Sequence, residues 1–190
     1  MALDLGGARH WARALQLEAA GTGSTCLDAT MGNGGDTEAL CRLVGPSGRV
    51  YAFDVQPEAL ESTRARLAAQ GFAERAQLFL LGHEHMAEVV REPLDLIVFN
   101  LGWLPGVPDK TLTTRAQTTL QALAAAQSLL KKGGLVTVCA YPGHDEGARE
   151  LACLLDWAAA LDARTWQVVV KLYWNQPPQA PVLIALQRIK

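Results

Sequence analysis

A glycine-rich segment flanked by acidic residues is the first group in this chain that could do chemistry. It runs from Asp28 to Thr37, reads DATMGNGGDT and follows a short apolar run. Glycines let the backbone pass close to a ligand, and the start of a following helix presents unpaired N–H groups. The segment lacks the last glycine of the dinucleotide fingerprint G-x-G-x-x-G. It therefore indicates a ligand-binding loop of another kind, with an ordinary glycine turn as the alternative.

The carboxylates of this segment narrow the kind of ligand. Asp28 and Asp36 would repel a pyrophosphate, but they could hold the ammonium group of an amino-acid ligand. This pattern favours S-adenosylmethionine over a nicotinamide dinucleotide. We expect Asp28 and the turn Gly32–Gly34 to hold the methionine end. The cofactor contacts predicted in this segment are Asp28, Thr30, Gly32, Asn33, Gly34, Asp36 and Thr37.

An acidic residue at the end of the next apolar run is the second feature. Asp54 closes the run RVYAFD and lies about 20 residues beyond the glycine loop, where a carboxylate can accept both ribose hydroxyls of a nucleoside. Its alternative role is to cap a helix that begins near Pro57. Gln56 could border the adenine. We predict that Asp54 and Gln56 contact the cofactor.

A histidine pair follows the third apolar run. In GHEHM, His83 and His85 have the H-x-H spacing of metal sites, but no third ligand of zinc type is nearby. In a nucleoside-binding sheet this turn faces the adenine. We therefore assign His83 and Glu84 to the cofactor wall and predict no metal. A helix cap or surface position and a metal site are the other interpretations.

The segment Asn100–Pro105, NLGWLP, follows the fourth apolar run. Many amino-group methyltransferases carry an Asn/Asp-Pro-Pro-aromatic tetrad at this place, and Asn100 and Trp103 keep its spacing. An amine that attacks a methyl sulfonium must aim its lone pair at the methyl carbon. A carboxamide oxygen can accept its hydrogens and orient it, and an aromatic ring can stack on a flat base. We predict that Asn100 and Trp103 are catalytic, the alternative being a turn with a packed tryptophan.

Two further segments follow strand ends and should border the same crevice. The cations Lys110 and Arg115 could contact phosphate, and His144 could accept a proton or contact the substrate. Taken singly, each of these could also be a solvated loop residue. The substrate contacts predicted from these segments are Pro105, Asp109, Lys110, Arg115, Tyr141 and His144.

Short β-branched runs alternate with longer Ala/Leu-rich segments, which is typical of a parallel sheet covered by helices. The predicted strands are Thr25–Ala29, Arg49–Asp54, Ala76–Leu81, Leu94–Asn100, Gly134–Ala140, Thr165–Trp174 and Val182–Gln187. The predicted helices are Ala8–Ala20, Asp36–Leu43, Pro57–Gln70, Thr111–Lys132 and Asp145–Leu161. We expect Asp36 and Thr37 to cap the second helix, and Lys131, Lys132 and Gly133 to close the fourth.

This order of elements predicts the fold class. The last two strands are separated by too few residues for a parallel crossover, so they should pair antiparallel. The sequence thus predicts an α/β fold with a doubly wound, Rossmann-like, seven-stranded, mostly parallel sheet and a final antiparallel hairpin. That is the pattern of the class I methyltransferases, but fold-level analogy alone does not license their function.

Composition limits the remaining classes. The chain has 190 residues, of which 49% are hydrophobic and 19% charged, so we expect one domain over residues 1–190 and exclude disorder, collagen and a coiled coil. Its net charge of −2 argues against nucleic-acid binding through bulk positive charge, although a local basic patch is allowed. We expect no membrane span, no secretory signal and a cytoplasmic protein. The four cysteines are expected to be small core residues: Cys26, Cys41, Cys139 and Cys153.

Together, DATMGNGGDT, VYAFDVQ, HEHM, FNLGWLPG…DK and YPGH…EG…E resemble the small bacterial methyltransferases labelled putative rRNA methylases. The resemblance covers about Cys26 to Lys190. It implies a class I methyltransferase that uses S-adenosylmethionine. Members of that family are assigned as tRNA 5-(aminomethyl)-2-thiouridine methyltransferases, so the implied substrate is the aminomethyl group on the wobble uridine of tRNA. The implied partner is a tRNA anticodon stem-loop. This chain departs from the family at Val107-Pro108, in the loop where the family reads Pro-Gly-Gly-Asp-Lys, and the change reshapes the loop next to the target.

Two other functions stay open at this point. A methyltransferase acting on rRNA or on a small metabolite would use the same cofactor site and differ only in its substrate loops. A non-enzymatic module that binds a nucleoside would keep the cofactor site without methyl transfer. The sequence also leaves the oligomeric state open, a homodimer included.

Overall fold

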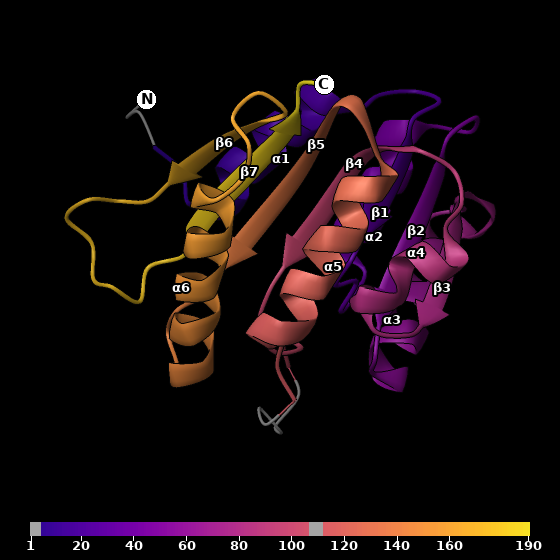
Figure 1. The fold of residues 1–190 in the computed structure, drawn as a ribbon. Helices are drawn as coiled ribbons and strands as arrows, with labels where there is room; N and C mark the ends of the chain where they lie inside the picture. The colour runs from indigo at the N-terminus through magenta and orange to yellow at the C-terminus, as the bar shows by residue number, and fades with distance from the viewer. Residues whose placement is uncertain (1–4, 107–111) are drawn as a thin grey trace.

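A computed structural model describes residues 5–106 and 112–190 of the chain. It contains a seven-stranded sheet in the order β3-β2-β1-β4-β5-β7-β6 (Figure 1). The strand pairs among β1 to β5 are parallel, whereas β7 is antiparallel to both β5 and β6. The predicted doubly wound sheet with a final antiparallel hairpin is therefore confirmed. No helix in the described ranges is long and apolar enough to cross a membrane.

The elements follow one another in the alternating order that the sequence predicts. The strands are β1 (Thr25–Asp28), β2 (Arg49–Asp54), β3 (Ala76–Leu80), β4 (Leu94–Asn100), β5 (Leu130–Ala140), β6 (Trp166–Lys171) and β7 (Val182–Arg188). The helices are α1 (Ala8–Ala19), α2 (Gly35–Val44), α3 (Pro57–Ala69), α4 (Met86–Val89), α5 (Ala116–Leu129) and α6 (Asp145–Ala159). Single 3₁₀ turns lie at Ala73–Arg75 and His83–His85.

Alternating side chains along the strands build a core on each face of the sheet, because successive strand residues point to opposite sides. In β1, Leu27 packs with α4, α5 and α6, whereas its neighbour Cys26 packs with α1, α2 and α3. Figure 1 shows α5 and α6 in front of the sheet, and α1 and α2 behind it. Helices on both faces bury the central strands and leave the strand ends as the accessible edge.

The strand order reverses at β1, which pairs with β2 on one side and with β4 on the other. The helices that follow β1 and β4 leave on opposite faces, so a crevice opens beyond the carboxyl ends of these strands. Asp28, Asp54 and Asn100 are the last residues of β1, β2 and β4. The topology therefore brings together the three polar strand ends that the sequence singles out.

The predicted helix Thr111–Lys132 is wrong at both ends. Its first residue lies outside the described ranges, and α5 begins only at Ala116 and ends at Leu129. Lys131, Lys132 and Gly133 belong to β5, because the strand pairs with β4 from Leu130 onward across a bulge. The ammonium of Lys131 binds Asp95 at 2.7 and 2.8 Å. A basic pair followed by glycine thus marks a strand bulge here rather than a helix C-terminus.

Three smaller expectations also fail. Asp36 and Thr37 do not cap α2, because the helix already begins at Gly35 and both side chains bind residues of other elements. Cys153 is exposed, whereas the other three cysteines are buried as expected. The sixth strand ends at Lys171 rather than Trp174, and the Tyr173 hydroxyl beyond it donates to the Gly6 carbonyl near the start of the chain.

Candidate active site

A cavity of about 550 Å³ lies at the carboxyl edge of the sheet, beside the strand-order reversal. It is lined by residues that follow β1, β2, β3, β4 and β5, which places one continuous site across five strand ends. The predicted site residues that line it are Thr30, Gly32, Asn33, Asp36, Asp54, Gln56, His83, Glu84, Asn100, Trp103, Pro105, Tyr141 and His144.

Four predicted contacts do not line this cavity. These residues are Asp28, Gly34, Thr37 and Arg115. Arg115 is exposed at the start of α5, where it precedes the first helical residue. Asp109 and Lys110 lie outside the described residues. The first three make contacts within the protein, and their role toward a ligand stays a prediction.

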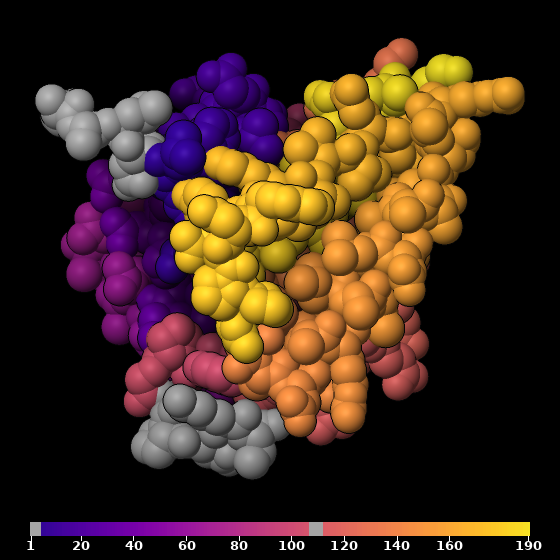
Figure 2. All heavy atoms as spheres, turned by 90° about the vertical axis from the view of Figure 1, so that its left-hand side faces the viewer, coloured from indigo at the N-terminus to yellow at the C-terminus, as the bar shows by residue number. Residues whose placement is uncertain are grey.

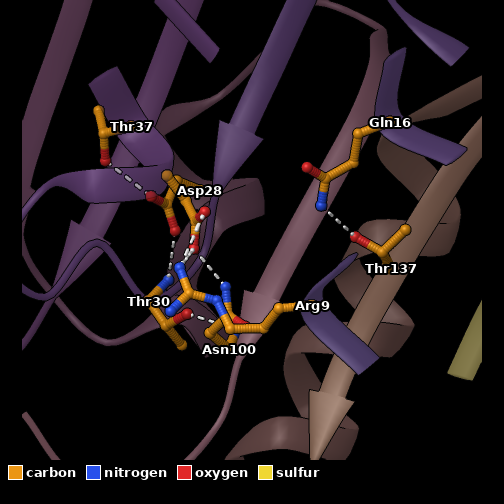
Figure 3. A network of polar contacts seen from close by, with 8 residues as sticks. Arg9, Gln16, Asp28, Thr30, Thr37, Asn100 and Thr137 are labelled. Carbon is orange, nitrogen blue, oxygen red and sulfur yellow. Dashed lines mark hydrogen bonds and ion pairs between the residues drawn. The ribbon is translucent and has the colours of Figure 1, made fainter. Parts of the chain in front are cut away.

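Asp28 faces the protein interior rather than the ligand space. Its carboxylate accepts hydrogen bonds from the Thr37 hydroxyl at 2.7 Å and from the Thr30 amide at 3.1 Å (Figure 3). Asp28 and Thr37 are fully buried. Burial, with a further contribution from the nearby charge of Asp36, raises the pKa of Asp28 to about 7. Asp28 thus positions the loop after β1 and the first turn of α2.

Gly34 is required by the packing of α3 against the glycine loop. Its φ of +78° lies in the left-handed region, which residues with a Cβ rarely adopt. A Cβ at this position would also lie 2.9 Å from the Thr63 Cα of α3. The Thr63 hydroxyl in turn donates to the Gly32 carbonyl at 3.0 Å. The close approach of α3 therefore fixes the shape of the glycine loop from behind.

Asp54 joins the end of β2 to the glycine loop. One carboxylate oxygen accepts the Gly32 amide at 3.0 Å, and the other accepts the Gln56 amide at 3.0 Å. Each oxygen keeps a second lone pair that can face the cavity. Asp54 can therefore accept hydroxyl donors from a ligand without giving up its contacts within the protein.

His83 forms part of the cavity wall in its neutral form. Its Nδ1 lies 3.2 Å from the Ala29 carbonyl, and because a carbonyl only accepts, Nδ1 carries the proton. Burial lowers the pKa of His83, and its ring meets the Phe99 ring edge-on. No group of three or more His, Cys, Asp or Glu side chains that could hold a metal occurs among residues 5–106 and 112–190.

The side chain of Asn100 is held in one orientation by Asp36. The Asn100 Nδ2 donates to Asp36 Oδ2, and because a carboxylate only accepts, this contact fixes which end of the amide is nitrogen. The Asn100 backbone amide donates to the Thr30 hydroxyl at 2.7 Å. Arg9 of α1 donates to both Asp36 oxygens at 3.4 Å, and Figure 3 shows Arg9, Thr30 and Asn100 close together.

The oxygen of the Asn100 amide, Oδ1, has no such contact. Asn100 Oδ1 is buried and has no hydrogen-bond partner in the part of the chain that the structure describes. An unsatisfied buried carbonyl costs about 1–3 kcal/mol, so such atoms are rare unless a ligand completes them. Because Asn100 lines the cavity, its amide is a candidate acceptor for a donor group of a ligand there.

Trp103 and His144 form the opposite wall. Their ring centroids lie 4.6 Å apart at an interplanar angle of 40°. His144 Nδ1 accepts the Gly147 amide at 3.2 Å and caps α6, so the neutral ring carries its proton on Nε2. That Nε2 and the Thr113 Oγ1 are buried without partners among the described residues. Burial also raises the pKa of the neighbouring Tyr141 to about 12, which keeps its hydroxyl protonated.

Sequence reasoning missed the residue that fixes this wall. Glu150 of α6 is 2% exposed and accepts the hydroxyls of Thr114 at 2.8 Å and Thr119 at 2.6 Å. Thr114 Oγ1 also accepts the Gly102 amide at 2.8 Å, and Trp103 pairs with Thr113 as an isolated β-bridge. Glu150 is the last residue of the YPGH…EG…E pattern, but its role was not predicted, because its partners lie on other segments.

Two further side chains tie the two halves of the site together. Arg66 of α3 donates to the Asn33 carbonyl at 2.8 Å, and the Asn33 side chain donates to the Pro105 carbonyl at 2.9 Å. The glycine loop after β1 is thereby linked to the segment after β4. Arg66 lines the cavity and was not predicted, whereas Asn33 was predicted as a cofactor contact.

Comparisons with known proteins agree with this geometry. Residues 50–187 match the family model described as "Putative rRNA methylase". A putative rRNA methylase from Clostridium thermocellum has a solved structure that superposes with a TM-score of 0.96 and 34% identity, covering 98% of this chain and 100% of that one. A putative methyltransferase from Streptococcus mutans, solved in complex with SAH, gives a TM-score of 0.88 and 31% identity over 97% of this chain and 99% of its own.

One curated relative has a more specific name. The chain is 41% identical over 172 residues to the chloroplastic tRNA (mnm(5)s(2)U34)-methyltransferase of Arabidopsis thaliana. The match covers 85% of this chain but 62% of the relative, so this chain spans less than two thirds of that protein's length.

The raised pKa of Asp28 predicts how stability depends on pH. Between about pH 4 and pH 7 the folded protein keeps a proton that the unfolded chain has released, so the free energy of unfolding falls as pH rises through this window. Asp28→Asn removes that titration. Urea unfolding gives the free energy of unfolding at about pH 5 and about pH 8. Between these pH values it should fall by on the order of 2 kcal/mol more in the wild type than in the variant. The same difference at both pH values would contradict the buried carboxyl.

The close approach of α3 predicts opposite effects at neighbouring glycines. Gly34→Ala should destabilise the protein by about 2–4 kcal/mol, because it combines left-handed strain with a clash against the Thr63 backbone. Gly35→Ala is the matched control, since a Cβ there meets nothing within 4 Å and the residue is helical. Thermal unfolding should show the control equal to or above the wild type. Equal stability of both variants would exclude the packing role of Gly34.

Proposed function

The chain belongs to the family described as "Putative rRNA methylase", and from this premise we propose that it methylates an amine nitrogen of RNA. The proposed acceptor is the aminomethyl group of 5-aminomethyl-2-thiouridine at the wobble position of tRNA. The product would be 5-methylaminomethyl-2-thiouridine together with S-adenosylhomocysteine. The name of the Arabidopsis relative supports this choice of substrate, as does the geometry around Asn100.

Whatever its exact substrate, the chain is an S-adenosylmethionine-dependent methyltransferase. The family match and the full-length structural likeness agree, and the relative from Streptococcus mutans was solved with SAH bound. The prediction of S-adenosylmethionine as cofactor is therefore confirmed. The assignment of individual cofactor contacts remains a prediction.

The residues of the cavity fit this cofactor. S-adenosylmethionine supplies a methyl group on a positively charged sulfonium, and it also carries an ammonium group and a pair of ribose hydroxyls. The carboxylates of Asp36 and Asp54 line one continuous cavity, which suits a ligand with positive charge and hydroxyl donors. Asp54 and Gln56 would hold the nucleoside, with His83 and Glu84 along its wall. The loop from Thr30 to Asp36 would hold the methionine end.

The observation that carries the proposal is the free amide oxygen of Asn100. Its Nδ2 is committed to Asp36, so Oδ1 is presented to the cavity as a buried acceptor of fixed orientation. A primary amine has N–H groups to donate and a lone pair to aim. Accepting one N–H at Oδ1 would direct that lone pair, and alignment alone can supply several orders of magnitude in rate. A carbon or carboxylate acceptor would gain nothing from such a group.

The opposite wall suits a planar base. Trp103 offers an aromatic face beside His144, and the buried Nε2–H of His144 is a donor without a partner among the described residues. A uracil ring has carbonyl oxygens that accept such a donor, and aromatic side chains bind unstacked bases in RNA recognition. Pro105 and Tyr141 border the same space. A flat, carbonyl-bearing base with an aminomethyl arm therefore matches both walls of the site.

Replacing Asn100 tests the proposed chemistry. Asn100→Ala should lower the rate of methyl transfer by about a hundred-fold or more, because the amine loses its oriented acceptor. Single-turnover kinetics with saturating cofactor and an anticodon stem-loop that carries 5-aminomethyl-2-thiouridine measure this rate.

Cofactor affinity in the same variant provides the control. It should stay within a few-fold of the wild type, because the nucleoside end of the cavity does not involve Asn100. If Asn100→Ala transfers the methyl group at the wild-type rate, the segment after β4 is only a structural turn.

Replacing Asp54 tests the other end of the cavity. Asp54→Ala should weaken S-adenosylmethionine binding by about 1.5–3 kcal/mol, the scale of hydrogen bonds to a charged group. Asp156→Ala removes an exposed carboxylate of α6 and serves as the charge-matched control. Isothermal titration calorimetry with each folded variant gives the affinity. Unchanged binding in Asp54→Ala would remove Asp54 from the cofactor site.

A further inference from the structure

A second groove of about 430 Å³ adjoins the active cavity on the side of α1. Its lining includes Arg9, His10, Arg13, Asp36 and Asn100. The active cavity shares three of these lining residues, Arg9, Asp36 and Asn100. The two spaces therefore meet at Asn100, the residue that we propose orients the target amine.

The helix α1 presents its cations to this groove because of its periodicity. Ala8, Ala12 and Gln16 recur at intervals of four residues and are buried. Ala8 and Ala12 pack against Cys139 of β5 and Leu183 of β7, and Gln16 donates to Thr137 of β5 at 3.0 Å (Figure 3). Arg9 and Arg13 follow the two alanines by one position each, so they lie one turn apart beside the buried stripe.

The two arginines differ in what they already bind. Arg9 is paired with Asp36, and its charge offsets that carboxylate. Arg13 forms no hydrogen bond or ion pair within the described ranges, and it is only partly exposed. An uncommitted guanidinium in a groove is a ready partner for an anionic oxygen. It also gives the groove a local positive charge that can attract a nucleic acid, although the net charge of the chain is −2.

We propose that this groove binds a backbone phosphate of the RNA substrate, with Arg13 as the principal contact. The inference rests on the proposed function, because the RNA must pass Asn100 to place an amine there. A nucleotide that enters the active cavity carries phosphates on both sides. The groove is continuous with that cavity at Asn100, and it opens along α1 toward solvent.

The hairpin between β6 and β7 carries a further cation beside α1, on the flank of the helix away from the groove, and its residues do not line the groove. The Lys171 ammonium lies 3.3 Å from the centre of the Trp11 ring, and the Tyr173 hydroxyl donates to the Gly6 carbonyl. Trp174 is 94% exposed. Figure 2 shows this connection between β6 and β7, in gold, against the indigo N-terminal segment. Cations interleaved with an exposed aromatic ring are typical of surfaces that bind single-stranded nucleic acid.

Arg13 can be tested without disturbing the catalytic contacts, whereas Arg9 cannot, because its partner Asp36 holds Asn100. Fluorescence anisotropy with a labelled anticodon stem-loop should give about ten-fold weaker binding for Arg13→Glu and a smaller loss for Arg13→Ala. The slope of log affinity against log salt concentration should become smaller by about one in Arg13→Ala, because one phosphate contact is lost. The control is Arg164→Ala, an exposed arginine before β6, which should bind the RNA like the wild type.

The outcomes separate this proposal from the proposed function. If the wild type binds the stem-loop and Arg13→Glu weakens that binding, the groove stands even if no methyl transfer to the amine is seen. Methylation kinetics then add a second readout, a raised KM for the stem-loop with kcat within about two-fold, since one contact to phosphate positions RNA rather than the reacting atoms. Equal RNA affinity of wild type and Arg13→Glu, or no RNA binding by the wild type, would overturn the groove.

Discussion

The hydrogen bond from the Asn100 side chain to Asp36 is the interaction on which the site depends. It fixes the orientation of the amide and leaves its oxygen as a buried acceptor without a partner among the described residues. The geometry around it follows from the fold: β4 delivers Asn100, the glycine loop after β1 delivers Asp36, and the strand order reverses between β1 and β4. A methyltransferase that acts on a neutral amine needs alignment more than a strong base, and this arrangement provides alignment.

This geometry places three carboxyl groups close to one another, and their mutual repulsion must be offset. Asp28 is buried with a raised pKa and is satisfied by Thr30 and Thr37. Asp36 is paired with Arg9, and Asp54 accepts two backbone amides at the end of β2. A positively charged ligand in the cavity would offset the negative charges of Asp36 and Asp54, which both line it. The acidic character of the site thus favours the same cofactor that the family implies.

The sequence predicted what depends on local pattern. Apolar runs located all seven strands, and the polar residue at the end of each central strand located the crevice, because parallel strands end at one edge. It did not predict contacts made across the fold. Asp28 and Gly34 lie in the right loop but serve Thr37 and Thr63, and Glu150 has partners more than thirty residues away. The predicted end of α5 was wrong, because the pairing of β5 with β4 overrides the preference of Lys131 and Gly133 for a helix C-terminus.

The most direct measurement is mass spectrometry of tRNA nucleosides from cells that lack this protein, complemented with the wild type or with Asn100→Ala. Loss of the protein should leave 5-aminomethyl-2-thiouridine in place of its methylated form. The wild type should restore the methylaminomethyl nucleoside, and the variant should not. Unchanged levels of the methylated nucleoside in cells without the protein would contradict the assignment of this amine as the acceptor.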